Sequence, residues 1–578
     1  MTARFADTDQ LRPTVVAHAQ ERHAFDGDLD QAAARVGGAN PFIGLSGRQI
    51  GAALARWAGH LLADPPVAAD HALRLAGGLI RVAAGSSPVE PERGDRRFAD
   101  PAFETNPLYR RLEQAYLVWR AQTLATVDDL RLSERNADRA RFALSLITEA
   151  SAPTNALPGN PSAIKKAFDT GGISLVRGAR NLLDDVLHNG GMPSMVDRRP
   201  FKVGTTLATT PGAVVFRNDV LELIQYLPST TSIRERPTLL VPPQINKFYA
   251  LDLAPGRSFV EHAVSRGIPF FVISWRNPTP AQCDWGLDTY LAATLEAIDS
   301  TLEISRSDDL NLLSMCAGGL TASALLGHMS AIGDKRVKAA GLAVTGIDVS
   351  VRSQMNIFAS KATVAAALRA SARRGVLPGS DMAKVFAWMR PNDLVWNYWV
   401  NNYLLGEQPP AFDVLAWNAD TTNLPAQLHA EFLHMFLENP LTRPGGMTAL
   451  GTPLDLGAVT CDIYALGAVT DHLVPWRSAY QATQLFGGAT RFVLSSSGHI
   501  QAIVCPPSNT KARYFVNEDT VADPDAWLKA ATEKAGSWWD DWAEWTIERS
   551  GAERPAPTRA GSRKHPVLVA APGTYVLE

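Results

Sequence analysis

Residues 310–319 read LNLLSMCAGG, an apolar, strand-like run that ends at a cysteine among small residues. The residues that follow, LTASALLGHMS (320–330), have the composition of a helix. Cys316 therefore lies at a predicted strand-to-helix turn, with Ser314 two positions before it and Gly318 two positions after it. This is the arrangement of a nucleophile elbow, where the tight turn requires small residues on both sides of the reactive one. The pattern predicts that the Cys316 thiol projects from the carboxyl edge of a β-sheet.

Two polar residues later in the chain are candidate partners of Cys316. Asp471 follows the strand-like run CDIYALGAV (461–469), and His499 follows the run TRFVLSSS (490–497). In folds with such an elbow, an acid and then a base follow the nucleophile along the chain, each in a loop beyond a strand. The order Cys316, Asp471, His499 agrees with this rule. We therefore interpret Cys316 as a nucleophile rather than as a buried structural cysteine, which is the default for this residue type.

Other residues are expected around this site. His472 adjoins Asp471 and competes with His499 for the role of base, but neighbouring side chains at the end of a strand point apart. We expect His472 to lie beside the site, and a purely structural role is the alternative. The expected oxyanion hole combines the Ala317 backbone N–H with a second N–H from the loop after TLLVPP, around Gln244 to Asn246.

The character of the chain changes near residue 205. Residues 1–205 read as a mainly helical domain, whereas in residues 206–550 short β-rich runs alternate with helix-length segments. Such alternation, with continuously apolar strands, predicts a parallel sheet covered on both faces. Together with the elbow, this pattern predicts the α/β class and an α/β-hydrolase fold. The Pro-, Gly- and Ala-rich residues 551–578 are expected to form a flexible tail.

Residues from about 350 to 450 interrupt the alternation and are expected to form a cap over the carboxyl ends of the strands. This segment is rich in aromatic residues, which we interpret as contributing to gating and self-association. Ordinary packing of the cap is the alternative. The aromatic residues are Trp388, Trp396, Tyr398, Trp399 and Tyr403.

The composition excludes several classes of protein. The 578 residues carry a net charge of −3, so no basic excess points to nucleic acid. The four cysteines form no CxxC pair, which disfavours a zinc site and a disulfide framework. The first residues, MTARFADTDQ, lack the layout of a signal peptide, and no run of 18 apolar residues predicts a membrane span. We expect a cytoplasmic protein with reduced thiols and no metal site.

Several longer motifs go beyond a generic hydrolase pattern. They are DRRFADPAF (95–103), NPLYRR (106–111), VPPQINKFYALDL (241–253), SWRNPT (274–279), SMCAGG (314–319), RPNDLVWNYWVNNYL (390–404), DHLVPW (471–476) and SGHIQ (497–501). With these motifs the chain resembles the polyhydroxyalkanoate synthases over roughly residues 95–550. The run MAKVFAWMRPNDLVWNYWVNNYLLG (382–406) and the ending PGTYV are most similar to the class II enzymes. One departure is Ser314, because the family's elbow usually opens with Gly.

The resemblance implies a polymerase that transfers the acyl group of (R)-3-hydroxyacyl-CoA to Cys316, releases CoA and extends a polyester. The family's acid and base fall on Asp471 and His499. A cysteine suits this chemistry because a thioester keeps the acyl group activated toward a hydroxyl, whereas a serine ester does not. The resemblance also implies no cofactor, a homodimer, and a cytoplasmic location at the surface of polyester granules.

Two alternatives belong to other functional classes. A polyester depolymerase or an acyl-CoA thioesterase shares the fold, but it normally uses serine and has no need of a long helical N-terminal part. A non-catalytic protein of the granule surface has no need of the triad. An assay with 3-hydroxyacyl-CoA separates the three classes. Free CoA with polymer indicates a synthase, and free CoA with free acid indicates a hydrolase. The absence of both products indicates a scaffold.

Overall fold

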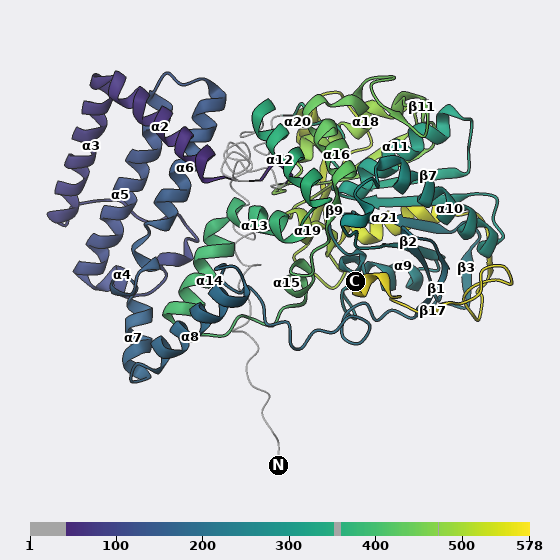
Figure 1. Ribbon diagram of the computed structural model, residues 1–578, viewed down its shortest axis with the longest axis horizontal. Coiled ribbons are helices and arrows are strands. Elements are labelled where there is room, and N and C mark those ends of the chain that lie inside the picture. Colours follow the sequence, from purple (N-terminus) through teal and green to yellow (C-terminus); the bar gives the residue numbers. More distant parts are fainter. Residues whose placement is uncertain (1–41, 45, 352–359, 472) are drawn as a thin grey trace, which may run out of the picture.

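The computed structural model describes residues 42–44, 46–351, 360–471 and 473–578 (Figure 1). In that part of the chain, an 11-stranded sheet has the order β15 (Thr532–Ala535), β14 (Arg513–Val516), β13 (Thr490–Ser495), β12 (Asp462–Ala468), β7 (Val337–Ala343), β6 (Leu310–Met315), β4 (Thr238–Val241), β5 (Phe270–Trp275), β2 (Leu221–Tyr226), β1 (Gly212–Arg217) and β17 (Val569–Ala570). Neighbouring strands from β13 to β5 run parallel. The strands outside this block pair antiparallel. The parallel block confirms the predicted α/β class.

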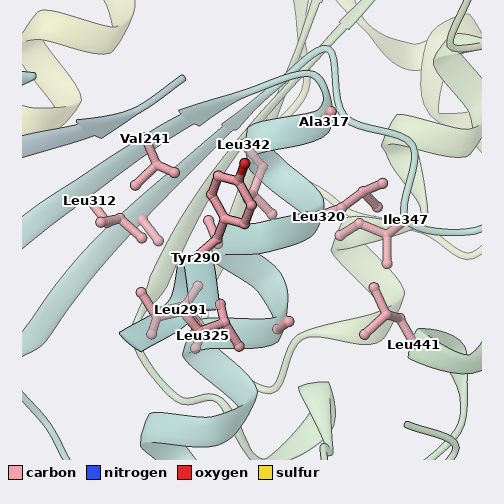
Figure 2. Close-up of a cluster of buried hydrophobic side chains, with 14 of the residues drawn as sticks. Val241, Tyr290, Leu291, Leu312, Ala317, Leu320, Leu325, Leu342, Ile347 and Leu441 are labelled. Atoms are coloured by element: carbon pink, nitrogen blue, oxygen red, sulfur yellow. The ribbon is translucent and has the colours of Figure 1, made fainter. Parts of the chain in front are cut away.

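Helices cover both faces of this sheet because alternate residues of a strand point to opposite sides. In β4, Leu239 and Val241 join one hydrophobic cluster and Leu240 joins the other. Figure 2 shows the first cluster, in which Val241 and Leu312 lie opposite Tyr290. Burying each such side chain contributes about 1.5–3 kcal/mol to folding. The first cluster includes α10 (Leu287–Ser305) and α11 (Ala317–Ala331), and the second includes α9 (Phe259–Ser265) and α21 (Trp538–Glu548).

The segment between β7 and β12 forms the insertion that we expected as a cap, of which residues 352–359 lie outside the described residues. Its helices are α12 (Lys361–Arg374), α13 (Gly379–Met389), α14 (Asn397–Trp399) flanked by the π-helical turns η9 (Asn392–Trp396) and η10 (Val400–Leu404), α15 (Asp413–Asn418) and α16 (Ala426–Glu438). Short helices beyond β12 are α17 (Trp476–Tyr480), α18 (Ala482–Leu485), α19 (His499–Ile503) and α20 (Pro524–Ala530). Two-stranded pairs join β8 (Val376–Leu377) to β9 (Leu424–Pro425) and β10 (Thr448–Ala449) to β11 (Thr452–Pro453).

The N-terminal region is helical, as predicted, although residues 1–41 and 45 lie outside the described residues. Its helices are α2 (Gly47–Ala63), α3 (Pro65–Ala83), α4 (Ala102–Thr105), α5 (Pro107–Asp129), α6 (Glu134–Ala150), α7 (Pro161–Asp169) and α8 (Ile173–His188). Figure 1 shows them to one side of the sheet, with α13 and α14 of the cap insertion between the two parts.

The N-terminal helices contact the cap insertion through buried polar groups. The Tyr403 hydroxyl of η10 donates to the Asp185 carboxylate of α8 at 2.7 Å, and both residues are buried. The Asn181 amide donates to the Asn402 carbonyl at 3.0 Å. At Gly178, a Cβ would collide with the Tyr403 carbonyl, so this position requires glycine for close packing. The N-terminal region therefore docks on the cap insertion.

The last 28 residues differ from the flexible tail that we expected. Within them, β16 (Glu553–Pro555) pairs with β3 (Ser232–Arg234), and β17 extends the main sheet at β1. Tyr575 lies in the 3-10 turn η13 (Tyr575–Leu577) and is buried. The segment is ordered because its partners are strands more than 300 positions earlier in the chain, which local composition cannot reveal.

Candidate active site

Cys316 lies at the sharp turn between β6 and α11. Its backbone has φ 51° and ψ −126°, a conformation that non-glycine residues seldom adopt. A backbone hydrogen bond holds the turn against β7, because the Cys316 N–H donates to the Ala343 carbonyl at 2.9 Å. The thiol is half-buried. Strained residues of this kind concentrate at functional sites, and the nucleophile of an elbow turn has such a conformation.

The residues after Cys316 must be small because neighbouring backbone and side-chain atoms lie close to them. A Cβ at Gly318 would lie 2.5 Å from the Val241 carbonyl oxygen at the end of β4, and one at Gly319 would collide with Thr345. Ser314 takes the position that is usually glycine in the family. Its buried hydroxyl donates to the Gly341 carbonyl at 2.8 Å, so the turn accommodates the extra atoms without an unpaired polar group.

The structure brings Asp471 and His499 together at the carboxyl ends of the neighbouring strands β12 and β13. His499 Nδ1 lies 2.6 Å from Asp471 Oδ2, and both side chains are almost completely buried. The other carboxylate oxygen accepts from the N–H groups of Leu473 and Val474 at 2.8 and 2.9 Å. These two backbone donors fix the carboxylate, which in turn fixes the orientation of the imidazole.

The electrostatic environment of His499 connects it to the nucleophile. Burial by itself lowers the pKa of His499, but Asp471 and then Cys316 outweigh it through charge and side-chain hydrogen bonds. The resulting pKa lies well above its ordinary value, because the imidazolium is stabilised beside Asp471 and Cys316. Asp471 thus orients His499, and the effect of Cys316 on the pKa of His499 indicates that the two side chains interact.

The expected oxyanion-hole residues lie at the same edge of the sheet. Ala317 is the first residue of α11, and the 242–247 loop follows β4, which pairs directly with β6. The Gln244 side chain packs on α11, where its amide donates to the Thr321 hydroxyl at 2.9 Å. The roles of the Ala317 N–H and of the Gln244 to Asn246 segment stay predictions.

The predictions about His472, a metal site and a membrane span have different outcomes. His472 lies outside the described residues, so the prediction that it lies beside the site stays open. In the part of the chain that the structure describes, no group of three or more His, Cys, Asp or Glu side chains is arranged to hold a metal ion. No helix among these residues is long and apolar enough to cross a membrane.

Sequence reasoning missed the residues that hold the 242–247 loop. The Trp275 indole donates to the Pro242 carbonyl at 2.9 Å, and the Trp417 indole of α15 donates to the Lys247 carbonyl at 2.8 Å. Lys247 itself is 8% exposed. A lysine inside the apolar run VPPQINKFYALDL was the available signal, because a buried lysine requires specific partners.

The fold and the arrangement at Cys316 define an α/β-hydrolase-fold protein with cysteine in the nucleophile position. Comparison with known families agrees, because a model described as "alpha/beta hydrolase fold" matches residues 237–505. A second model, described as "Poly-beta-hydroxybutyrate polymerase (PhaC) N-terminus", matches residues 94–263.

Curated relatives cover nearly the whole chain. Poly(3-hydroxyalkanoate) polymerases 1 and 2 of Ectopseudomonas oleovorans are 49% and 48% identical to it, over 95% and 93% of this chain and 98% and 96% of their own. The poly(3-hydroxyalkanoate) polymerase subunit PhaC of Cupriavidus necator is 38% identical over 86% of this chain and 85% of its own. The chain belongs to the poly(3-hydroxyalkanoate) polymerase family. The family and the class of enzyme, a transferase, are therefore confirmed.

Proposed function

We propose that the chain polymerises (R)-3-hydroxyacyl-CoA into a polyester, with release of CoA, through a thioester on Cys316. The observation that carries this proposal is a cysteine at the elbow beside the buried pair of Asp471 and His499. The relatives named poly(3-hydroxyalkanoate) polymerase support the class of product. CoA is part of the substrate and then a product, and the proposed reaction requires no cofactor.

In the acylation step, His499 takes the proton of the Cys316 thiol, and the thiolate attacks the carbonyl carbon of the hydroxyacyl-CoA. The oxyanion that forms would accept hydrogen bonds from the Ala317 N–H and from a donor in the Gln244 to Asn246 segment. The bond from the carbonyl carbon to the CoA sulfur then breaks. CoA leaves as a thiol after it receives the proton that His499 took.

In the elongation step, a hydroxyl of a second hydroxyacyl group attacks the Cys316 thioester. A base removes the hydroxyl proton, an ester bond forms, and the bond to the Cys316 sulfur breaks. We assign this second proton transfer to His499 rather than directly to Asp471. In support, both carboxylate oxygens of Asp471 already accept hydrogen bonds from His499, Leu473 and Val474, and carboxylates are weak bases toward alcohols.

We also place the growing polyester, and with it the granule surface, against the helical hairpin of α7 and α8. An apolar recess of about 520 Å³ lies there. Phe168 is 89% exposed and Val176 is 71% exposed, which is unusual for apolar side chains on a free surface. Further exposed apolar residues of this hairpin are Ile164, Ile173, Leu183, Val186 and Leu187. We call these seven residues the hairpin face. The homodimer expected from the resemblance stays a prediction.

The test supplies (R)-3-hydroxyacyl-CoA to the purified full chain and measures free CoA, free hydroxy acid and insoluble polyester together. We expect CoA and polyester in equivalent amounts, with little free acid. A preparation that released CoA and an equal amount of free acid would instead be the thioesterase of the same fold. A preparation that released neither would be a non-catalytic scaffold and would contradict the proposal.

A further inference from the structure

Lys247 is a buried cation with three oxygen partners. Its ammonium donates to the backbone oxygens of Val576 at 2.6 Å and Glu578 at 2.9 Å, and it lies 3.2 Å from the Asp420 carboxylate. The two backbone oxygens belong to the C-terminal segment, and Asp420 follows α15 of the cap insertion. Two of its N–H groups donate to backbone oxygens, and the ion pair with Asp420 balances its charge. A buried charge is costly unless it is paired and hydrogen-bonded, so these contacts indicate a specific structural role for Lys247.

The cap insertion makes further contacts near the end of the 242–247 loop. The Asp420 carboxylate also accepts a hydrogen bond from the Tyr249 hydroxyl at 2.8 Å. Asn246 forms an isolated antiparallel bridge with Thr421. Together with the Trp417 indole on the Lys247 carbonyl, these contacts join the end of the 242–247 loop to the cap insertion.

Besides these polar contacts, the apolar packing of Ile245 and Phe248 holds this end of the loop. Its sheet pairing ends at Val241, and it begins with two prolines, which have no N–H to donate. Trp275 and Thr321 hold its first half through Pro242 and Gln244. Asn246 and Lys247 form its second half, where the polar contacts come from the cap insertion and the C-terminal segment.

We propose that Lys247 is a positioning residue that holds the Gln244 to Asn246 segment in place for the oxyanion by tying it to the C-terminal segment and the cap insertion. The inference rests on the proposed function. Oxyanion donors stabilise a transition state only when they are fixed before the reaction, because a displacement of about 1 Å loses most of their effect. The arrangement also makes acyl transfer depend on two segments that do not touch the reacting atoms.

The test compares two reactions of Cys316 in the full chain with Lys247→Met. Alkylation by iodoacetamide needs the thiolate but forms no oxyanion, whereas acylation by a p-nitrophenyl 3-hydroxyacyl ester needs both. Modification is read on the Cys316 peptide by mass spectrometry, because Cys283 is exposed and also reacts. Lys564→Met is the matched control, since Lys564 lies in the C-terminal segment, is 77% exposed and pairs only with Glu303 among the described residues.

We expect Lys247→Met to slow acylation about tenfold or more, less than the loss of a whole donor, and to leave alkylation within about threefold of the parent rate. Lys564→Met should change neither. Acylation within about twofold of the parent overturns the proposal, and so does an equal loss of both reactions, which indicates a collapsed site. Asp420→Asn, a smaller change, gives the same comparison should Lys247→Met fail to fold. A parent chain that releases no CoA from (R)-3-hydroxyacyl-CoA contradicts the proposed function alone, because the ester still tests Lys247.

Discussion

A sulfur atom in place of an oxygen at the elbow changes what the same three side chains can do. His499 and Asp471 have the mutual geometry of a hydrolase pair, with 2.6 Å between imidazole and carboxylate. The Cys316 sulfur contributes to the raised pKa of His499 through its negative charge, after the contribution of Asp471. The nucleophile also determines the activation of the acyl group, because a thioester passes it to a hydroxyl more readily than an oxygen ester does.

Replacing Cys316 with serine tests this point. We expect Cys316→Ser to abolish polymer formation, with a fall of at least about 10³-fold in the rate of CoA release, because the hydroxyl is a weaker nucleophile and its ester no longer drives transfer. CoA release and insoluble polyester are measured in parallel. Cys283→Ser is the control, since that thiol is exposed and lies outside the site. Polymer formation by Cys316→Ser at the parent rate would contradict the thioester intermediate.

At the scale of elements, the turn between β6 and α11 depends on its contact with β4. A Cβ at Gly318 would lie 2.5 Å from the Val241 carbonyl oxygen, and backbone cannot move aside as a flexible side chain can. We expect Gly318→Ala to lower the free energy of unfolding by about 1–3 kcal/mol through overpacking and to slow acylation about tenfold or more. Urea unfolding and CoA release measure the two effects.

Gly51→Ala is the matched control for this substitution. Gly51 lies inside α2, and a Cβ there meets no atom within 4 Å. Alanine should therefore leave activity unchanged and stabilise the helix by about 0.5–1 kcal/mol. Gly318→Ala with the stability and activity of the parent would show that the contact between the turn and β4 is not tight.

The sequence predicted strands with continuously apolar residues, and it missed strands in which a buried polar residue depends on a distant partner. Strand β2, LELIQY, was not predicted because Glu222 interrupts its apolar pattern. In the structure, Glu222 is fully buried and accepts from the N–H groups of Thr574 and Tyr575 at 2.8 and 3.0 Å. The same contacts explain why the C-terminal segment is ordered. Neither β2 nor the C-terminal segment can be predicted alone, because Glu222 is the acceptor and the N–H groups of Thr574 and Tyr575 are the donors.

The candidate site divides in the same way. Cys316, Asp471 and His499 could be identified because the elbow is a local pattern and the order of the partners along the chain is fixed by the fold. The partners of Lys247 could not be identified, because they lie more than 170 positions away, at Asp420 and in the C-terminal segment. Local patterns predict the reacting groups, whereas the residues that hold them require the tertiary structure.

At the scale of the whole molecule, the aromatic residues of the cap insertion have partners within the chain. Tyr398 and Tyr403 are buried, and the Trp399 indole donates to the Asn155 carbonyl of the N-terminal region at 3.0 Å. Trp388, Trp396, Trp399 and Tyr403 form a run of edge-to-face ring contacts. This packing joins the N-terminal helices to the catalytic part, whether or not the segment also serves self-association.

The joined N-terminal region leaves the hairpin face exposed, and this face is proposed to contact the polyester. Replacing Val176, Leu183 and Leu187 of α8 with glutamate puts charge on it without touching the buried side of the helix, where Gly178 and Asp185 pack. We expect the triple variant to lose at least about tenfold in cosedimentation with polyester particles, because a charge cannot be buried against an apolar polymer. CoA release during the first turnovers should stay within about twofold of the parent, since the residues lie outside the site.

The control is a triple variant of α2 and α3 residues that are 80%, 73% and 69% exposed, namely Leu62→Glu, Leu73→Glu and Ile80→Glu. Unchanged cosedimentation of the α8 variant, or an equal loss in the control, would show that the hairpin face is not a specific polymer contact.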